Sequence, residues 1–154
     1  MKTIEGLLNG EQMKVAIVAA RFNDWIVSRL VDGAKDGLRR NGVDLDQVDI
    51  YYVPGAFEIP LVTKKVVATG NYDGVICLGA VIRGETPHFD YVCAEVSKGI
   101  ATVSMDYETP VMFGILTTDT VDQAADRAGA KSGNKGFEAA LGLIEMVRLM
   151  ENIA

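Results

Sequence analysis

Four short apolar segments recur along the chain, and a stretch with helical spacing follows each of them. Apolar runs rich in valine, isoleucine and alanine are typical of strands that helices cover on both faces. Residues 74–82 form the most apolar run and predict a central strand. The other predicted strands are residues 13–20, 48–53 and 111–117. Because strands and helices alternate, the sequence predicts a parallel sheet with right-handed crossovers.

The segments between the strands end at residues that suit helix termini. Gly42 follows the first of these segments, residues 24–40, and is a signal for the end of a helix. Thr86 and Pro87 are expected to open a helix, because threonine is a good cap and proline suits the first helical position. The predicted helices are residues 24–40, 58–68, 88–104, 121–128 and 135–150. We therefore expect one α/β domain over residues 1–154, a three-layer sandwich in which helices flank a flavodoxin-like parallel four-stranded sheet.

Composition and charge narrow the class of protein. With 49% hydrophobic and 23% charged residues, the chain of 154 residues can bury a sizeable core. Its mean hydropathy of +0.17 is high for a small domain, which predicts that an oligomer hides part of the surface. A net charge of −6, without a run of lysine and arginine, argues against binding of nucleic acid or anionic lipid. A bound phosphate must therefore be held by a local site.

Cysteine usage and the first residues bear on cellular location. Residues 1–10 lack the basic start and long apolar centre of a signal peptide. No apolar stretch approaches the roughly 18 residues that a membrane span needs. Cys77 and Cys93 form no Cys-x-x-Cys pair, and the chain has one histidine. This pattern predicts two reduced, buried cysteines, no metal site and a cytoplasmic protein without a membrane partner.

Open parallel sheets bind ligands beyond the carboxyl ends of their strands, and three of these ends carry unusual loop residues. Phe22 follows the first predicted strand, where its ring can stack on a planar heterocycle or fold back onto the core. Phe57 follows the second strand and poses the same question, with packing somewhat favoured. Glu58 stands at a helix start, where it can accept hydrogen bonds from sugar hydroxyls or simply complement the helix dipole.

The segment after the third strand is the richest in candidate site residues. Gly84 allows a tight turn, and Thr86 with its neighbours presents free N–H groups at a helix start, an arrangement that attracts phosphate. His88 lies in the first turn of the same helix, whose positive end favours a neutral imidazole that exchanges protons near pH 7. A lone histidine at such a position is more often incidental, but the neighbouring phosphate cradle favours catalysis.

A basic cluster lies in the glycine-rich segment 127–136. Arg127, Lys131 and Lys135 form a reasonable anion clamp in an acidic protein, since arginine suits bidentate phosphate contact. A solvated connection between helices is the alternative. The sequence has neither a P-loop nor a Gly-x-Gly-x-x-Gly signature, which argues against nucleotide binding.

Together these segments resemble the lumazine synthase family over essentially the whole chain. The matching pieces are residues 20–23, 53–60, 78–84 with Thr86 and His88, 113–118, 127–129 and 133–136. The resemblance implies a transferase of riboflavin biosynthesis that needs no cofactor and no metal. The implied reaction condenses 5-amino-6-(D-ribitylamino)uracil with 3,4-dihydroxy-2-butanone 4-phosphate to 6,7-dimethyl-8-ribityllumazine, with release of phosphate and water.

The resemblance also implies a role for each site residue. Phe22 would stack on the pyrimidine, and His88 would transfer protons. Phe113 would close the ring pocket, while Arg127, with Lys135 nearby, would bind phosphate. The remaining implied contacts are Ala56, Phe57 and Glu58 to the ribityl chain, Ala80, Val81 and Ile82 to the ring edge, and Glu85 and Thr86 in the phosphate pocket.

The last predicted helix carries an apolar band too wide for a single packed face. Its members are Phe137, Leu141, Leu143, Ile144, Met146, Val147 and Met150. We expect a neighbouring subunit to cover it. The resemblance implies homopentamers in which Phe113, Arg127 and Lys135 of one chain reach the Phe22 and His88 side of the next. It further implies a closed icosahedral shell of pentamers.

Two positions depart from the family pattern. Glu85 places a carboxylate in the phosphate loop where many relatives have a small uncharged residue, and Asp126 stands where a longer acid is common. The main alternative is therefore a catalytically weak relative that binds a flavin or serves mainly as a structural shell. A receiver-like module would need an acidic cluster at residues 21–23, and a flavodoxin-type electron carrier a hydroxyl-rich loop there; the sequence has neither.

Overall fold

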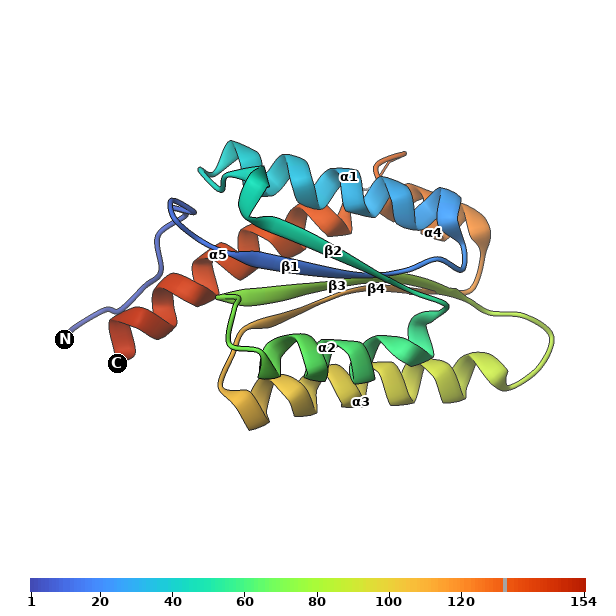
Figure 1. The fold of residues 1–154 in the computed structure, drawn as a ribbon. Coiled ribbons are helices and arrows are strands. Elements are labelled where there is room, and N and C mark those ends of the chain that lie inside the picture. The colour runs from blue at the N-terminus through green and yellow to red at the C-terminus, as the bar shows by residue number, and fades with distance from the viewer. Residues whose placement is uncertain (132) are drawn as a thin grey trace.

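The computed structural model describes residues 1–131 and 133–154, and its elements alternate as predicted (Figure 1). The strands are β1 (Val15–Ala20), β2 (Val48–Val53), β3 (Gly74–Ile82) and β4 (Val111–Thr118). The α-helices are α1 (Asp24–Arg40), α2 (Ile59–Ala68), α3 (His88–Tyr107), α4 (Val121–Arg127) and α5 (Lys135–Ile153). Short 3-10 turns, η1 (Leu45–Gln47) and η2 (Ala56–Glu58), precede β2 and α2.

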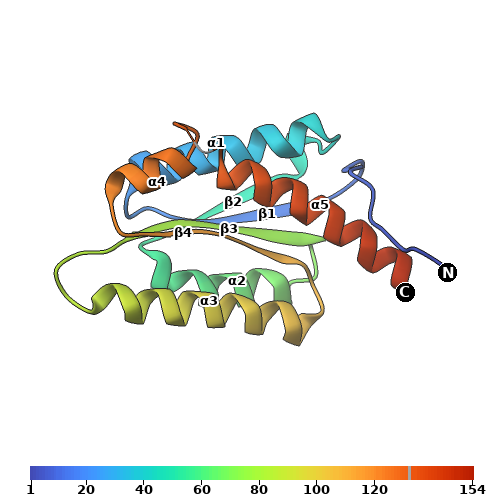
Figure 2. The ribbon, with the colours of Figure 1, turned by 180° about the vertical axis from the view of Figure 1, so that it is seen from behind.

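The four strands form one parallel sheet in the order β2-β1-β3-β4. Helices α1, α4 and α5 cover one face, and α2 and α3 cover the other (Figures 1 and 2). The whole of β1 and residues 74–80 of β3 are buried, which explains why these strands are uninterrupted apolar runs. The structure confirms the predicted three-layer α/β sandwich with a flavodoxin-like sheet.

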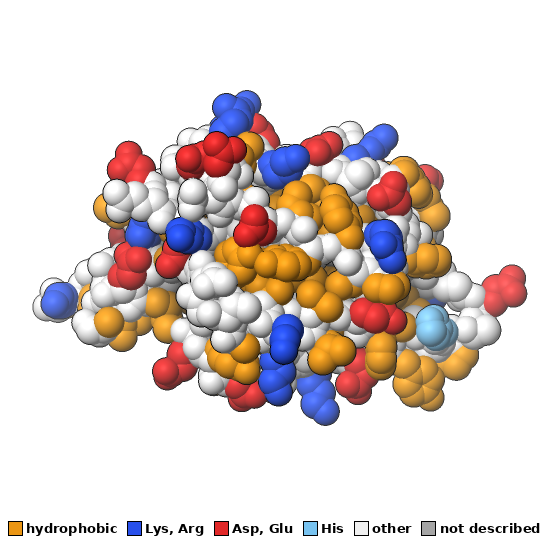
Figure 3. Space-filling view, viewed as in Figure 1, with side chains coloured by type: hydrophobic (Ala, Val, Ile, Leu, Met, Phe, Trp, Pro, Cys, Tyr) orange, Lys and Arg blue, Asp and Glu red, His pale blue; other side chains and the backbone are white. Residues whose placement is uncertain are grey.

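The outer surface of the helices and the exposed edge of the sheet differ in their side chains. Charged side chains are spread around the outside, whereas hydrophobic side chains gather across the middle of the face that carries the β2 edge (Figure 3). Tyr52 of β2 is 54% exposed there. Within residues 1–131 and 133–154, none of the helices has the length and apolar character needed to cross a membrane.

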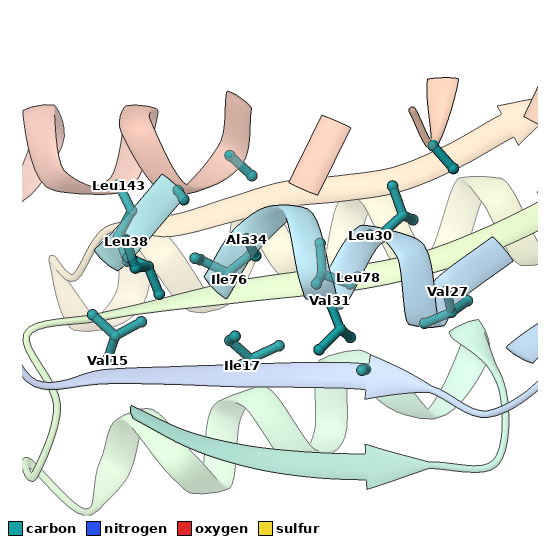
Figure 4. Close-up of a cluster of buried hydrophobic side chains, with 14 of the residues drawn as sticks. Val15, Ile17, Val27, Leu30, Val31, Ala34, Leu38, Ile76, Leu78 and Leu143 are labelled. Carbon is teal, nitrogen blue, oxygen red and sulfur yellow. The ribbon is translucent and has the colours of Figure 1, made fainter. Parts of the chain in front are cut away.

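Two clusters of buried side chains hold the layers together, one on each face of the sheet. Successive residues of β1 divide between them, because side chains alternate across a strand. Val15 and Ile17 pack toward α1 and α5, where they join Leu143 (Figure 4). Ala16 and Val18 belong to the cluster under α2 and α3.

Several boundaries differ from the predicted ones by a few residues. Strand β1 begins at Val15 rather than at residue 13, because the Lys14 N–H donates to the Asp73 carboxylate at 2.8 Å instead of joining the sheet. Helices α3 and α5 extend three residues beyond their predicted ends at 104 and 150. Pro87 is the residue before α3 rather than its first helical residue. The hydroxyl of Thr86 accepts a hydrogen bond of 3.4 Å from the His88 N–H.

Candidate active site

A hollow of about 750 Å³ lies beyond the carboxyl ends of β1 and β3. The chain leaves β1 toward β2 on one side, while β3 pairs with β1 on the other. Loops diverge at such a switch point, and open parallel sheets bind ligands there. Ala80, Val81 and Ile82 at the end of β3 contribute to its lining, together with the loops after β1 and β2 and the first turn of α3.

Two phenylalanine rings line this hollow and are largely uncovered. Phe22 is 71% exposed and Phe57 is 59% exposed, so the alternative in which these rings fold back onto the core is wrong for both. The Phe22 N–H donates to the Pro54 carbonyl at 3.1 Å, which joins the loop after β1 to the loop after β2. Exposed aromatic rings in a concave surface are suited to stacking on a planar ligand.

Ala56, Phe57 and Glu58 form the turn η2 and all line the hollow. Ala56 is buried, whereas Glu58 is exposed at the residue before α2. A Cβ atom at Gly55 would lie 3.2 Å from the Glu58 Oε2, so the carboxylate folds over this turn. An exposed carboxylate beside a hollow can accept hydrogen bonds from hydroxyl groups of a ligand.

Asn23 also lines the hollow, and sequence reasoning assigned it no role. Its backbone is left-handed, with φ 61° and ψ 43°, and its side-chain amide donates to the Ala80 carbonyl at 2.8 Å. The available signal was weak: asparagine is among the non-glycine residues that most readily adopt a left-handed backbone.

The loop between β3 and α3 forms another wall of the hollow. Gly84, Thr86 and His88 belong to the lining, while Glu85 is exposed and stands outside it. The single histidine is visible at the surface near this end of the molecule (Figure 3). The loop thus presents Thr86 and the start of α3 to the hollow.

Arg83, the first residue of this loop, is held on several sides. Its Nε donates to the Asp119 Oδ1 at 2.9 Å, and its Nη1 donates to the Asp90 Oδ1 at 3.4 Å. The guanidinium carbon lies 4.3 Å from the centre of the Phe89 ring. The hydrogen bond to Asp119 raises the pKa of Arg83 above its usual value. Sequence reasoning assigned no role to this residue.

Besides Glu85, three further predicted site residues lie outside the lining of the 750 Å³ hollow within one chain, as far as the described residues show. Phe113 is 45% exposed in a second hollow of about 440 Å³ along α3 and β4. Arg127 donates to the Gln123 carbonyl at 3.0 Å, and Lys135 forms an ion pair with Glu138 at 3.4 Å. One chain therefore brings together the Phe22, Phe57 and His88 group but leaves out the predicted phosphate clamp.

Asn134 orders the segment that carries the clamp residues. Its Oδ1 accepts hydrogen bonds from the Gly136 and Phe137 N–H groups, which caps α5. Its Nδ2 donates to the Arg29 carbonyl at 3.0 Å and to the Ala128 carbonyl at 3.3 Å. The ends of α4 and α5 are thereby fixed to α1, although residue 132 of the connection lies outside the described residues.

Both cysteines are free, as predicted, but the prediction that both are buried is wrong for Cys93, which is half-buried on α3. Cys77 is buried in β3 beside Thr63, whose hydroxyl lies 3.3 Å from its sulfur, and burial raises the pKa of the Cys77 thiol to about 12. Burial also raises the pKa of the half-buried Cys93. In the described part of the chain, acidic, histidine and cysteine side chains form no group of three or more that could hold a metal ion.

The fold defines an α/β protein with a hollow at the switch point of its parallel sheet, where proteins of this architecture bind ligands. A model of the 6,7-dimethyl-8-ribityllumazine synthase family matches residues 12–151. The chain therefore belongs to the 6,7-dimethyl-8-ribityllumazine synthase family, a family of transferases in riboflavin biosynthesis. The match confirms the resemblance found in the sequence and covers every strand and every residue that lines the hollow.

Proposed function

We propose that the chain condenses 5-amino-6-(D-ribitylamino)uracil with 3,4-dihydroxy-2-butanone 4-phosphate to 6,7-dimethyl-8-ribityllumazine. The observation that carries this proposal is the meeting of Phe22 and Phe57 with Gly84, Thr86 and His88 in one hollow. Its volume of about 750 Å³ falls within the range of roughly 300–1,000 Å³ typical of small-molecule sites. One part of the lining offers aromatic faces to a planar ring, and another part offers a helix start to an anion.

The first substrate is assigned to the aromatic wall. Stacking on Phe22 suits the pyrimidine ring, and such aromatic contacts contribute about 0.5–1.5 kcal/mol beyond burial. The ribityl hydroxyls would reach the exposed Glu58 carboxylate at the start of α2. Backbone groups of Val81 and Ile82 would meet the ring edge, because the lining includes both residues.

The second substrate is assigned to the loop between β3 and α3. Phosphate would bind at Thr86 and the start of α3, where helical N–H groups point outward. Condensation then requires the amine to attack the ketone and lose water as the imine forms, phosphate to leave, and the ring to close with loss of a second water. Each step moves protons, and His88 lies in the same lining to carry them.

A neighbouring subunit would complete the site. Phe113, Arg127 and Lys135 are remote from the hollow of their own chain, so we assign them to the hollow of the next subunit. Exposed apolar side chains at Met105, Phe113 and Met146 support an extensive contact between copies. The proposal extends to a homopentamer of single-domain chains and to an icosahedral shell of pentamers in the cytoplasm, where free cysteines stay reduced.

The proposal is tested by mixing purified protein with both substrates and recording lumazine fluorescence and phosphate release. We expect the two products in equal amounts. The variant Phe22→Ala should lose much of this activity, whereas Tyr52→Ala, which removes an exposed ring outside the hollow, should retain it. Absence of lumazine from the assembled wild-type protein would contradict the proposal and favour the alternative of a structural shell.

A further inference from the structure

The loop between β3 and α3 has little packing of its own. Residues 83–88 are all exposed, and a Cβ atom added at Gly84 would meet nothing within 4 Å. Such a segment takes many shapes unless its ends are fixed. The shape of the loop matters to the proposed function, because Gly84, Thr86 and His88 all face the hollow.

Arg83 fixes both ends of this loop at once. At the start of the loop, its N–H donates to the Thr118 carbonyl at 2.9 Å, and its side chain holds Asp119 at the same end of β4. At the far end, the guanidinium reaches Asp90 in the first turn of α3 and lies over the Phe89 ring, which is 9% exposed. The planar fork of arginine suits these simultaneous contacts, whereas a lysine ammonium does not reproduce them.

Arg83 is not directed at the hollow. The lining contains its neighbours Ile82 and Gly84 but not Arg83, and two carboxylates already accept hydrogen bonds from its guanidinium. Its positive charge also offsets Asp90 and Asp119, which would otherwise repel an anion bound at this loop. These contacts differ from those expected of a residue that binds substrate.

We propose that Arg83 is a positioning residue, which acts through Asp119, Asp90 and Phe89 to hold the β3–α3 loop in the shape that receives the anionic substrate. The catalytic part of this inference rests on the proposed function. The claim that Arg83 fixes the shape of the loop applies to the protein without substrate and does not depend on the reaction.

Steady-state kinetics of Arg83→Gln tests the catalytic part. We expect the KM for the ketone phosphate to rise roughly three- to tenfold, the range that two exposed ion pairs and one cation–π contact supply. The KM for the pyrimidine should stay within about twofold, since the aromatic wall is untouched. Arg83→Lys should recover only part of the loss. Complete recovery by lysine, or equal effects on both substrates, would overturn the proposal.

Asp119→Asn separates positioning from direct binding. If Arg83 acts through its ion pair, this variant raises the KM for the ketone phosphate as Arg83→Gln does, and the double variant is no worse than the poorer single one. If Arg83 binds substrate directly, freeing it from Asp119 leaves that KM unchanged or lowers it. The control is Arg39→Gln, which breaks an exposed ion pair with Asp36 on α1. This variant should leave all kinetic constants unchanged.

Amide hydrogen exchange of the substrate-free assembly tests loop holding without reference to the reaction. Arg83→Gln should speed exchange of the hydrogen-bonded amides at the two ends of the loop, those of residues 83, 88 and 90, at least severalfold and leave the β1 amides unchanged. Unchanged exchange of these three amides would overturn the inference. If the wild type makes no lumazine, the proposed function fails separately, and the exchange result alone decides whether Arg83 holds the loop.

Discussion

The side-chain amide of Asn23 donates a hydrogen bond of 2.8 Å to the Ala80 carbonyl oxygen. Asn23 lies in the loop after β1, and Ala80 lies near the end of the neighbouring strand β3, at the switch point of the sheet. The bond therefore ties the loop that carries Phe22 to the strand end that lines the hollow. Few side chains combine this reach with the left-handed backbone that Asn23 adopts at φ 61°.

Substitution of Asn23 should separate the hydrogen bond from the backbone conformation. Asn23→Gly loses the bond but tolerates positive φ, so we expect a stability loss of about 0.5–1.5 kcal/mol. Asn23→Ala should lose roughly 1–2 kcal/mol more, because alanine is strained there. Urea unfolding at a fixed protein concentration measures both. An alanine variant as stable as the glycine variant would show that the conformation carries no strain.

His88→Ala should slow turnover without abolishing it. Positioning of the two substrates is expected to contribute most of the rate, so the loss should lie at or below the low end of the roughly 10²–10⁴-fold range of general acid–base groups. Single-turnover kinetics at saturating substrate measures the loss. Complete inactivity of a natively assembled variant would indicate that His88 does more than move protons.

Arg127→Ala should weaken binding of the ketone phosphate more than binding of the pyrimidine. A charged hydrogen bond to phosphate is worth about 1.5–3 kcal/mol, so the KM for the phosphate substrate should rise by roughly 10- to 150-fold. Arg39→Ala, on α1, provides a charge-matched control that should behave as the wild type. Equal weakening of the binding of both substrates would contradict the assignment of Arg127 to the phosphate site.

Cys77 should make the stability of the protein fall in alkaline solution. Burial raises the pKa of its thiol from 9.0 to about 12. Between these values the unfolded chain releases the proton and the folded chain retains it, so rising pH favours unfolding. This contribution approaches about 1.4 kcal/mol for each pH unit inside the window. Below about pH 8 it is negligible, because the unfolded thiol is then almost fully protonated.

Unfolding free energies of wild type and Cys77→Ala, measured from pH 8 to 11, test this dependence. The variant should show a shallower decline, whatever its stability at pH 8. Cys93→Ala is the comparison, because the half-buried Cys93 should contribute less. Parallel pH profiles for the wild type and Cys77→Ala would show that the buried thiol titrates normally in the fold.

The fold and most of the hollow could be predicted from the sequence for a local reason. Buried parallel strands have uninterrupted apolar sequences. The residues that follow these strands meet at one edge of the sheet. Phe22, Phe57 and His88 are therefore recognisable as candidates from the sequence alone. Their exposure was harder to predict, because an aromatic ring after a strand has the same local pattern whether it packs inward or faces a ligand.

The contacts that shape the site were not predictable, since they join distant parts of the chain. Asn23 bonds to Ala80, and Arg83 to Asp119, across 57 and 36 residues respectively. Asn134 reaches the Arg29 carbonyl across 105 residues. Each of these side chains is ordinary in its local sequence, and only the packing of α1, β3 and α5 gives it partners.

A subunit-mixing experiment tests the central claim, a lumazine-forming site shared between adjacent chains, most directly. Phe22→Ala and Arg127→Ala chains are co-expressed, and the turnover of the mixed assembly is compared with that of each parent assembly. If Phe22 and Arg127 of adjacent subunits serve one site, some interfaces in the mixture carry both defects and others carry neither. The mixture should therefore be more active than either parent. Activity equal to the average of the two parents would contradict a shared site. Full activity of a protein that sediments as a monomer would contradict it as well.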